Sequence, residues 1–154
     1  MCETDEAIAK VRADVTATRR QARLASMDMR FPDASVSRYM SMVNDVDLPD
    51  PDDRHIVAAA RAGHADIIVT RNIKDFPEQA LRQFDLEVVD PDCFLLDMLD
   101  LFPMAMLEVV QEQANDTKRP PLSVQEVLES LEKVGVPQFA AQVRRMIDPN
   151  WVRR

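Results

Sequence analysis

The spacing of hydrophobic residues predicts alternating helices and short strands in the middle of the chain. Apolar residues at helical spacing predict a helix that begins near Asp52 or Asp53 and ends at Gly63, a residue type that often terminates helices. The β-branched run of residues 66–70 predicts a buried strand of a parallel sheet, and residues 86–89 predict the next strand after a brief helix. Helix, strand, helix, strand is half of a doubly wound α/β sheet.

The chain before this unit carries a weaker signal. Residues 5–29 show a weak helical pattern, which we expect to break at Phe31-Pro32 because proline disfavours helix in the residue before it. Residues 34–39 form a short segment that could be an edge strand. Residues 44–53 are acidic, contain prolines and are predicted to be mostly loop.

The chain from residue 92 onward shows a helical pattern throughout. Ser123 and Glu126 form a capping-box pattern ahead of one of these helices. We therefore predict an α/β domain over residues 1–90 and a helical extension over residues 91–154. Because no Gly/Ser-rich linker joins the two parts, we expect the helical annex to pack on the sheet domain.

Composition narrows the class of protein. The chain has 154 residues, of which 46% are hydrophobic and 30% charged, as in a soluble globular protein with one ordinary core. No stretch approaches the roughly 20 apolar residues needed to cross a membrane. The acidic N-terminus lacks the apolar region of a secretory signal, and two distant cysteines suggest neither a disulfide framework nor a zinc site. We therefore expect a reduced, cytoplasmic protein that does not bind membranes.

The net charge of −8 argues against broad nucleic-acid binding, which normally uses a basic surface. It does not exclude a nuclease, because carboxylates that hold metal ions are themselves acidic and the cations reverse the local sign. Two basic clusters, between residues 12 and 23 and between residues 144 and 154, could contact phosphates. Such residues are more often a solvated helix surface.

Two polar clusters flank the predicted helix and its following strand. Asp52 and Asp53 lie at the helix start, and Asn72 and Asp75 follow the strand. Turns of a parallel α/β unit meet at the carboxyl ends of the strands, so these side chains could converge on one divalent cation. Each cluster also has a purely structural alternative, since Asp is a preferred helix N-cap and Asn72 could form an Asx-turn.

The segment from Leu48 to Pro77 also resembles the second half of a PIN domain, the metal-dependent ribonuclease fold of the VapC-type toxins. The resemblance lies in the order of parts: Pro-Asp-x-Asp-Asp-Arg-His at a helix start, Ala-Ala-Ala on the helix, then Ile-Val-Thr-x-Asn-x-x-Asp-Phe. It extends over roughly Phe31 to Val143 and looks like a bacterial PIN subgroup with a C-terminal extension. The resemblance implies an α/β, parallel-sheet PIN-like domain followed by the helical annex.

The resemblance also implies a site. Asp53 falls where the family's helix-starting acid lies, with Asp52 as the alternative because the helix start is uncertain by a residue. Asn72 occupies the place of the family's fourth acid, and Asp75 could supply the charge in its stead. The implied catalytic residues are therefore Asp53, Asp75 and Asn72, and the implied ligands for Mg²⁺ or Mn²⁺ are Asp53, Asp52 and Asp75. The implied partners are RNA, a cognate antitoxin and a second copy of the chain.

The front of the chain differs from the family. PIN domains begin with a strand that delivers a first catalytic Asp, whereas no apolar strand precedes Asp5. We therefore expect an N-terminally shortened PIN domain. Three functions stay open: a toxin-type endoribonuclease, a truncated non-catalytic PIN remnant that acts as a protein-binding module, and an unrelated α/β module whose acidic turn is only a helix cap.

Overall fold

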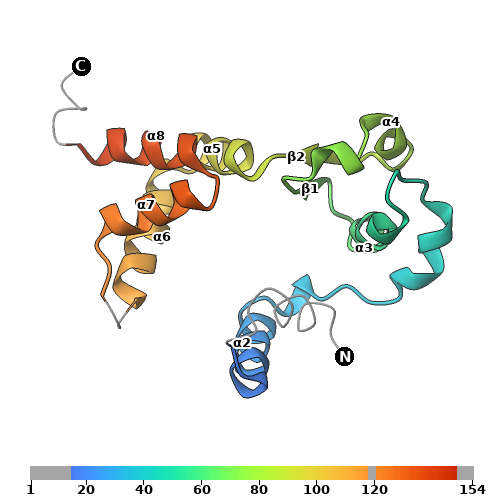
Figure 1. The fold of residues 1–154 in the computed structure, drawn as a ribbon, viewed down its shortest axis with the longest axis horizontal. Helices are drawn as coiled ribbons and strands as arrows, with labels where there is room; N and C mark the ends of the chain where they lie inside the picture. Colours follow the sequence, from blue (N-terminus) through green and yellow to red (C-terminus); the bar gives the residue numbers. More distant parts are fainter. Residues whose placement is uncertain (1–14, 118–120, 149–154) are drawn as a thin grey trace. The chain divides into compact units, whose positions relative to one another are not determined.

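A computed structural model describes residues 15–117 and 121–148 of the chain (Figure 1). The described chain divides into two compact units. The first unit comprises the chain up to Asp47 together with Pro51–Ala65, and the second comprises Leu48–Asp50 and the chain from Asp66 onward.

The first unit begins with helix α2, Ala17–Arg30, whose N-cap Thr16 accepts a hydrogen bond from the Arg19 backbone N–H. The helix ends directly before Phe31-Pro32, so the predicted break is confirmed. The predicted start of this helix near residue 5, and the expectation that no strand precedes it, lie outside the described residues. No residue of α2 is buried.

The edge strand predicted at residues 34–39 is wrong. Ala34 ends a short 3-10 helix, η1 (Pro32–Ala34), and Tyr39 begins another, η2 (Tyr39–Asp45). Arg38, between them, has a left-handed φ of 67°. A residue in this region turns the chain and cannot continue a strand, and the apolar pattern alone did not reveal it.

Helix α3, Arg54–Ala62, packs against η2 and follows the 3-10 turn η3, Pro51–Asp53. Its buried face carries Val57 and Ala58. The predicted end at Gly63 is confirmed: its N–H donates to Ala59 O at 2.9 Å. A Cβ on Gly63 would lie only 2.9 Å from Val36 Cγ2, so the close approach of the chain at residue 36 requires glycine here.

The second unit contains two parallel strands, β1 (Ile67–Val69) and β2 (Glu87–Val89), with Ile68 paired to Val88. Both predicted strands and their parallel pairing are confirmed. The expectation that the first strand is buried is wrong among the described residues, because only Ile68 is buried and Ile67 and Val69 are exposed. The chain between them forms short helices: η4 (Ile73–Asp75), α4 (Glu78–Leu81) and η5 (Arg82–Phe84). Ile68, Phe76, Leu81 and Leu86 are buried around the sheet.

In the part of the chain that the structure describes, four helices follow β2 and form the predicted annex. Proline at the first position opens three of them, where a missing N–H costs nothing. The predicted capping box of Ser123 and Glu126 is confirmed at the start of the remaining helix. The α/β fold class with a helical C-terminal region is therefore confirmed. The four helices are α5 (Pro91–Leu101), α6 (Pro103–Asp116), α7 (Val124–Lys133) and α8 (Pro137–Ile147).

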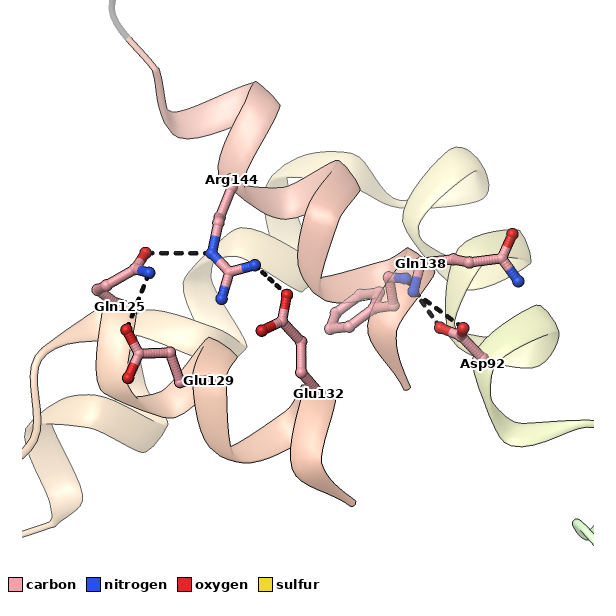
Figure 2. Close-up of polar contacts among 7 residues, drawn as sticks. Asp92, Gln125, Glu129, Glu132, Gln138 and Arg144 are labelled. Atoms are coloured by element: carbon pink, nitrogen blue, oxygen red, sulfur yellow. Dashed lines mark hydrogen bonds and ion pairs between the residues drawn. The ribbon is translucent and has the colours of Figure 1, made fainter. Parts of the chain in front are cut away.

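The annex has its own hydrophobic core, in which Leu99, Val110, Leu128, Phe139 and Val143 are buried. Polar contacts at its edge join the helices (Figure 2). Among the described residues, no helix is both long and apolar enough to cross a membrane.

Candidate metal site

The turn after β1 positions the side chain of Asp75. Thr70 Oγ1 accepts the backbone N–H of Asn72 at 3.1 Å, and Asn72 O accepts the N–H of Asp75 at 3.2 Å. The Asn72 side-chain amide donates to the Asp75 carboxylate. Asn72 and Asp75, which the sequence singled out together, therefore contact each other in one short turn. Both side chains are partly buried.

Asp50 lies beside Asp75 in the second unit. A carboxylate oxygen of one lies within 4.8 Å of a carboxylate oxygen of the other. Two such charges repel each other at this separation, and a cation between them would remove the repulsion. Two ligands of one hard divalent cation, each with a metal–oxygen distance of about 2.0–2.6 Å, lie no more than about 5.2 Å apart, and the two oxygens meet this limit. The two carboxylates are therefore placed as ligands of a single ion could be.

Sequence reasoning missed Asp50. It is the first acid of Asp-Pro-Asp-Asp and lies between two prolines, so it has the appearance of a loop residue. The signal that could have found it is its position three residues before Asp53. Three residues span at most about 10 Å even when fully extended, so both side chains can reach one ion.

Asp53 ends η3 and directly precedes α3. Its backbone is helical, with φ −86° and ψ −7°, and its side chain accepts no capping hydrogen bond from α3. A capping side chain normally comes from a residue with extended backbone. The Asp53 side chain therefore does not cap α3, which was the structural alternative to a role as a metal ligand. Asp52 lies in the same turn, is exposed, and directs its carbonyl oxygen at His55 Nδ1.

Two basic side chains near the turn, those of Arg71 and Lys74, differ in their surroundings. The guanidinium carbon of Arg71 lies 3.1 Å from the place that a Cβ on Gly135 would occupy, so this side chain covers the end of α7. Lys74 lines a hollow of about 960 Å³ beside the sheet. The lining of this hollow contains more acidic than basic side chains, so it would repel a phosphate group. The basic residues are Lys74 and Arg82, and the acidic residues are Asp66, Glu78, Asp85 and Glu87.

Comparison with known proteins bears on both parts of the chain. The family model described as "PIN domain" matches residues 3–74, and the model described as "VapC50 C-terminal domain" matches residues 91–145. A curated protein of Mycobacterium tuberculosis, named "Putative ribonuclease VapC50", is 42% identical over 94 residues. This alignment covers 61% of the chain and 55% of the relative, so the chain matches about half of that protein's length. No solved structure matches the chain.

Proposed function

Because the chain belongs to the PIN-domain family, as a VapC-type protein with a C-terminal extension, we propose that it is a metal-dependent endoribonuclease of toxin–antitoxin type. Membership of the family removes the third hypothesis, an unrelated module with a capped helix. The observation that carries the proposal is the approach of Asp50 to Asp75, which Asn72 holds by its side-chain amide.

In this proposal Asp50, Asp53 and Asp75 hold one Mg²⁺ or Mn²⁺ ion. The donors fit such an ion, since Asp50 and Asp75 of the second unit offer carboxylate oxygens at ligand spacing and the Asp53 carboxylate does not serve as a cap. A bound divalent cation would supply positive charge against the phosphodiester and activate the water that attacks it. Asn72 orients Asp75 through its amide N–H. Asp52 is the alternative ligand should the chain rotate at η3.

The proposed substrate is RNA, and the proposed protein partners are a cognate antitoxin and a second copy of the chain. The name of the 42% identical relative, a ribonuclease, supports the substrate class. We also propose the domain boundary between residues 90 and 91, because the C-terminal family model begins its match at residue 91. A cytoplasmic location is part of the same proposal.

The proposal is tested by measuring Mn²⁺ binding and RNA cleavage on the same preparations. Titration calorimetry should show Mn²⁺ binding by the unchanged chain and weaker binding by Asp50→Asn, Asp53→Asn and Asp75→Asn, since each substitution removes one charged ligand. Asp85→Asn, which changes an exposed acid outside the site in the same way, should bind Mn²⁺ like the unchanged chain.

Cleavage of RNA that requires Mn²⁺ and is lost in Asp75→Asn would support the ribonuclease. If the three site variants bind Mn²⁺ as tightly as the unchanged chain and the Asp85→Asn control do, then these carboxylates are not ligands of the ion. Mn²⁺ binding without any cleavage would favour the alternative, a non-catalytic PIN module that binds proteins.

A further inference from the structure

The turn between α5 and α6 exposes three large apolar side chains. Leu101 ends α5, Phe102 follows it, and Met104 is the second residue of α6. In this order, the three residues are 67%, 54% and 67% exposed. We call these three residues the apolar corner. All of them belong to the second compact unit.

The core of the annex does not include the apolar corner. Helices α5 and α6 bury Leu99 and Val110 in that core, and partly buried side chains such as Leu95 and Leu107 pack against it. The three residues of the apolar corner lie outside this cluster. Neighbouring apolar side chains that stay exposed on a soluble protein, and that are rimmed by polar residues, mark a surface that binds a partner.

The backbone of the apolar corner is held in place by hydrogen bonds. The N–H of Phe102 donates to Met98 O at 2.9 Å, and Phe102 O accepts the N–H of Met106 at 3.0 Å. Phe102 therefore joins the last turn of α5 directly to the first turn of α6. A surface that is ordered before binding loses little conformational entropy when a partner docks on it.

Acidic side chains flank the apolar corner. Asp97 lies one helical turn before Leu101 on α5, Asp100 directly precedes Leu101, and Glu108 lies one turn after Met104 on α6. All three acids are exposed. Within the part of the chain that the structure describes, none of the three carboxylates has a hydrogen bond or an ion pair. We call these three residues the acidic rim.

The charge around the apolar corner is of one sign. Residues 90–116 contain seven acidic residues and no Lys, Arg or His. Two of the seven have partners within the fold: Asp90 caps α5, and Asp92 accepts N–H groups of α8. The remaining negative charge repels RNA and anionic lipid headgroups, and it repels the same corner of a second molecule. The complementary partner is therefore cationic as well as apolar.

From this combination we infer that the apolar corner and the acidic rim dock a partner protein, through a segment of it that presents Lys or Arg side chains around apolar ones. Phe102, an aromatic side chain with Leu101 and Met104 beside it, would be removed from water at the centre of the contact, which supplies affinity. The acidic rim would meet the cationic side chains and supply specificity. Docking requires neither a metal ion nor RNA cleavage, so failure of the ribonuclease proposal would leave it standing.

A synthetic peptide serves as the probe of this surface. A fluorescein-labelled peptide of about 18 residues, with Leu at helical spacing and Lys at the other positions, presents both chemistries. Fluorescence anisotropy should show that the full chain binds this Lys peptide at about 0.1 M salt. Binding should weaken at about 1 M salt, where the screening length falls from about 10 Å to about 3 Å. The same peptide with Glu in place of Lys should bind more weakly by about tenfold or more.

Variants of the corner show where the probe binds. Leu101→Ser with Met104→Ser should weaken binding of the Lys peptide by about tenfold or more, because it removes apolar contact area. Asp97→Lys with Asp100→Lys should weaken it by a similar factor, because it places like charges side by side. This charge-reversed variant should in turn bind the Glu peptide more tightly than the unchanged chain does.

Matched controls change the annex outside the corner. Val134→Ser with Ile147→Ser removes two other exposed apolar side chains. Glu112→Lys with Asp116→Lys reverses two exposed acids that follow Met104 by 8 and 12 residues, or about 12–18 Å along α6. Both controls should keep binding of the Lys peptide within about twofold, since they lie beyond the contact and beyond the screening length. Circular dichroism checks that every variant is folded.

Three results would overturn the inference. The first is equal binding of the Lys peptide by the folded corner variants and the controls, or equal binding of the Lys and Glu peptides by the unchanged chain. The second is co-sedimentation of the chain with phosphatidylcholine vesicles that is lost in Leu101→Ser with Met104→Ser, which would assign the corner to a lipid surface. The third is a change in the association state of the chain alone in that variant, which would assign the corner to a second copy.

Discussion

The Asp92 carboxylate on α5 accepts the backbone N–H of Phe139 on α8 at 2.8 Å, across 47 residues of sequence. Its other oxygen accepts the N–H of Gln138 at 2.9 Å, as Figure 2 shows. The N-cap residue of α8 is Val136, whose side chain cannot accept a hydrogen bond. A carboxylate from another helix therefore satisfies the free N–H groups at this helix start, and its charge favours the positive end of the helix dipole.

We predict that Asp92→Ala lowers the free energy of unfolding by about 2–4 kcal/mol, because it leaves the buried N–H of Phe139 and the partly buried N–H of Gln138 without an acceptor. Asp92 is only 4% exposed, so water cannot readily replace the carboxylate. Urea unfolding monitored by circular dichroism measures the change. Asp97→Ala, on the exposed face of the same helix, is the matched control and should change stability by no more than about 0.5 kcal/mol. Equal losses of unfolding free energy in the two variants would show that the hydrogen bonds accepted by Asp92 do not stabilise the fold.

A second prediction concerns acid sensitivity of the annex. The hydrogen bond from Arg144 lowers the pKa of Glu132 below its ordinary value of 4.5, although partial desolvation opposes this. In the unfolded chain this carboxylate binds protons more readily than in the folded one. Stability from the pair is therefore present above the unfolded pKa and is lost as the pH falls through the lower folded pKa.

The urea midpoint of Glu132→Gln should lie below that of the unchanged chain near neutral pH, and the gap should close at acidic pH. A double-mutant cycle with Arg144→Met isolates the pair, since Arg144 also donates to Gln125 at 3.2 Å. A coupling that persists at acidic pH would contradict the prediction.

A third prediction concerns Gly135, which has a φ of 91°. We expect Gly135→Ala to destabilise the protein by about 1–2 kcal/mol, because alanine is strained at positive φ. The new Cβ would also lie 3.1 Å from the Arg71 guanidinium carbon and 3.2 Å from its Nη1. Truncation by Arg71→Ala should relieve the crowding but leave the backbone strain.

Thermal unfolding of the two single variants and the double variant separates these contributions. The double variant should be more stable than the sum of the single changes implies. Simple additivity would mean that Arg71 moves aside at no cost and that the strain of the backbone accounts for the whole effect.

The sequence predicted features that depend on a few neighbouring residues. The β-branched run before Thr70 and the capping box at Ser123 act through local propensity, and the structure has both where they were expected. The helix stop at Gly63 is of the same kind. Local signals failed at residues 34–39, where one left-handed residue, Arg38, separates two 3-10 helices.

Contacts between distant segments could not be predicted in this way. The sequence indicated that Asn72 and Asp75 share a turn, because three residues separate them. It could not show that Asp50 approaches Asp75, since this depends on the path of the chain over 25 residues. Asp92 likewise appears in the sequence as an ordinary acid in the first turn of a helix. Its bonds to Gln138 and Phe139 follow from the packing of α5 on α8.

The short strands described above have a thermodynamic consequence for the turn that follows β1. Strands β1 and β2 each contain three residues, and a pair of strands is at best marginally stable on its own in water. Their persistence therefore depends on the surrounding apolar packing, including Phe76 and Leu81, and on the compact unit they share with the annex. The turn from Thr70 to Asp75 therefore opens whenever that unit unfolds. The protection of its amide protons from hydrogen exchange cannot exceed the protection set by the free energy of unfolding of the unit.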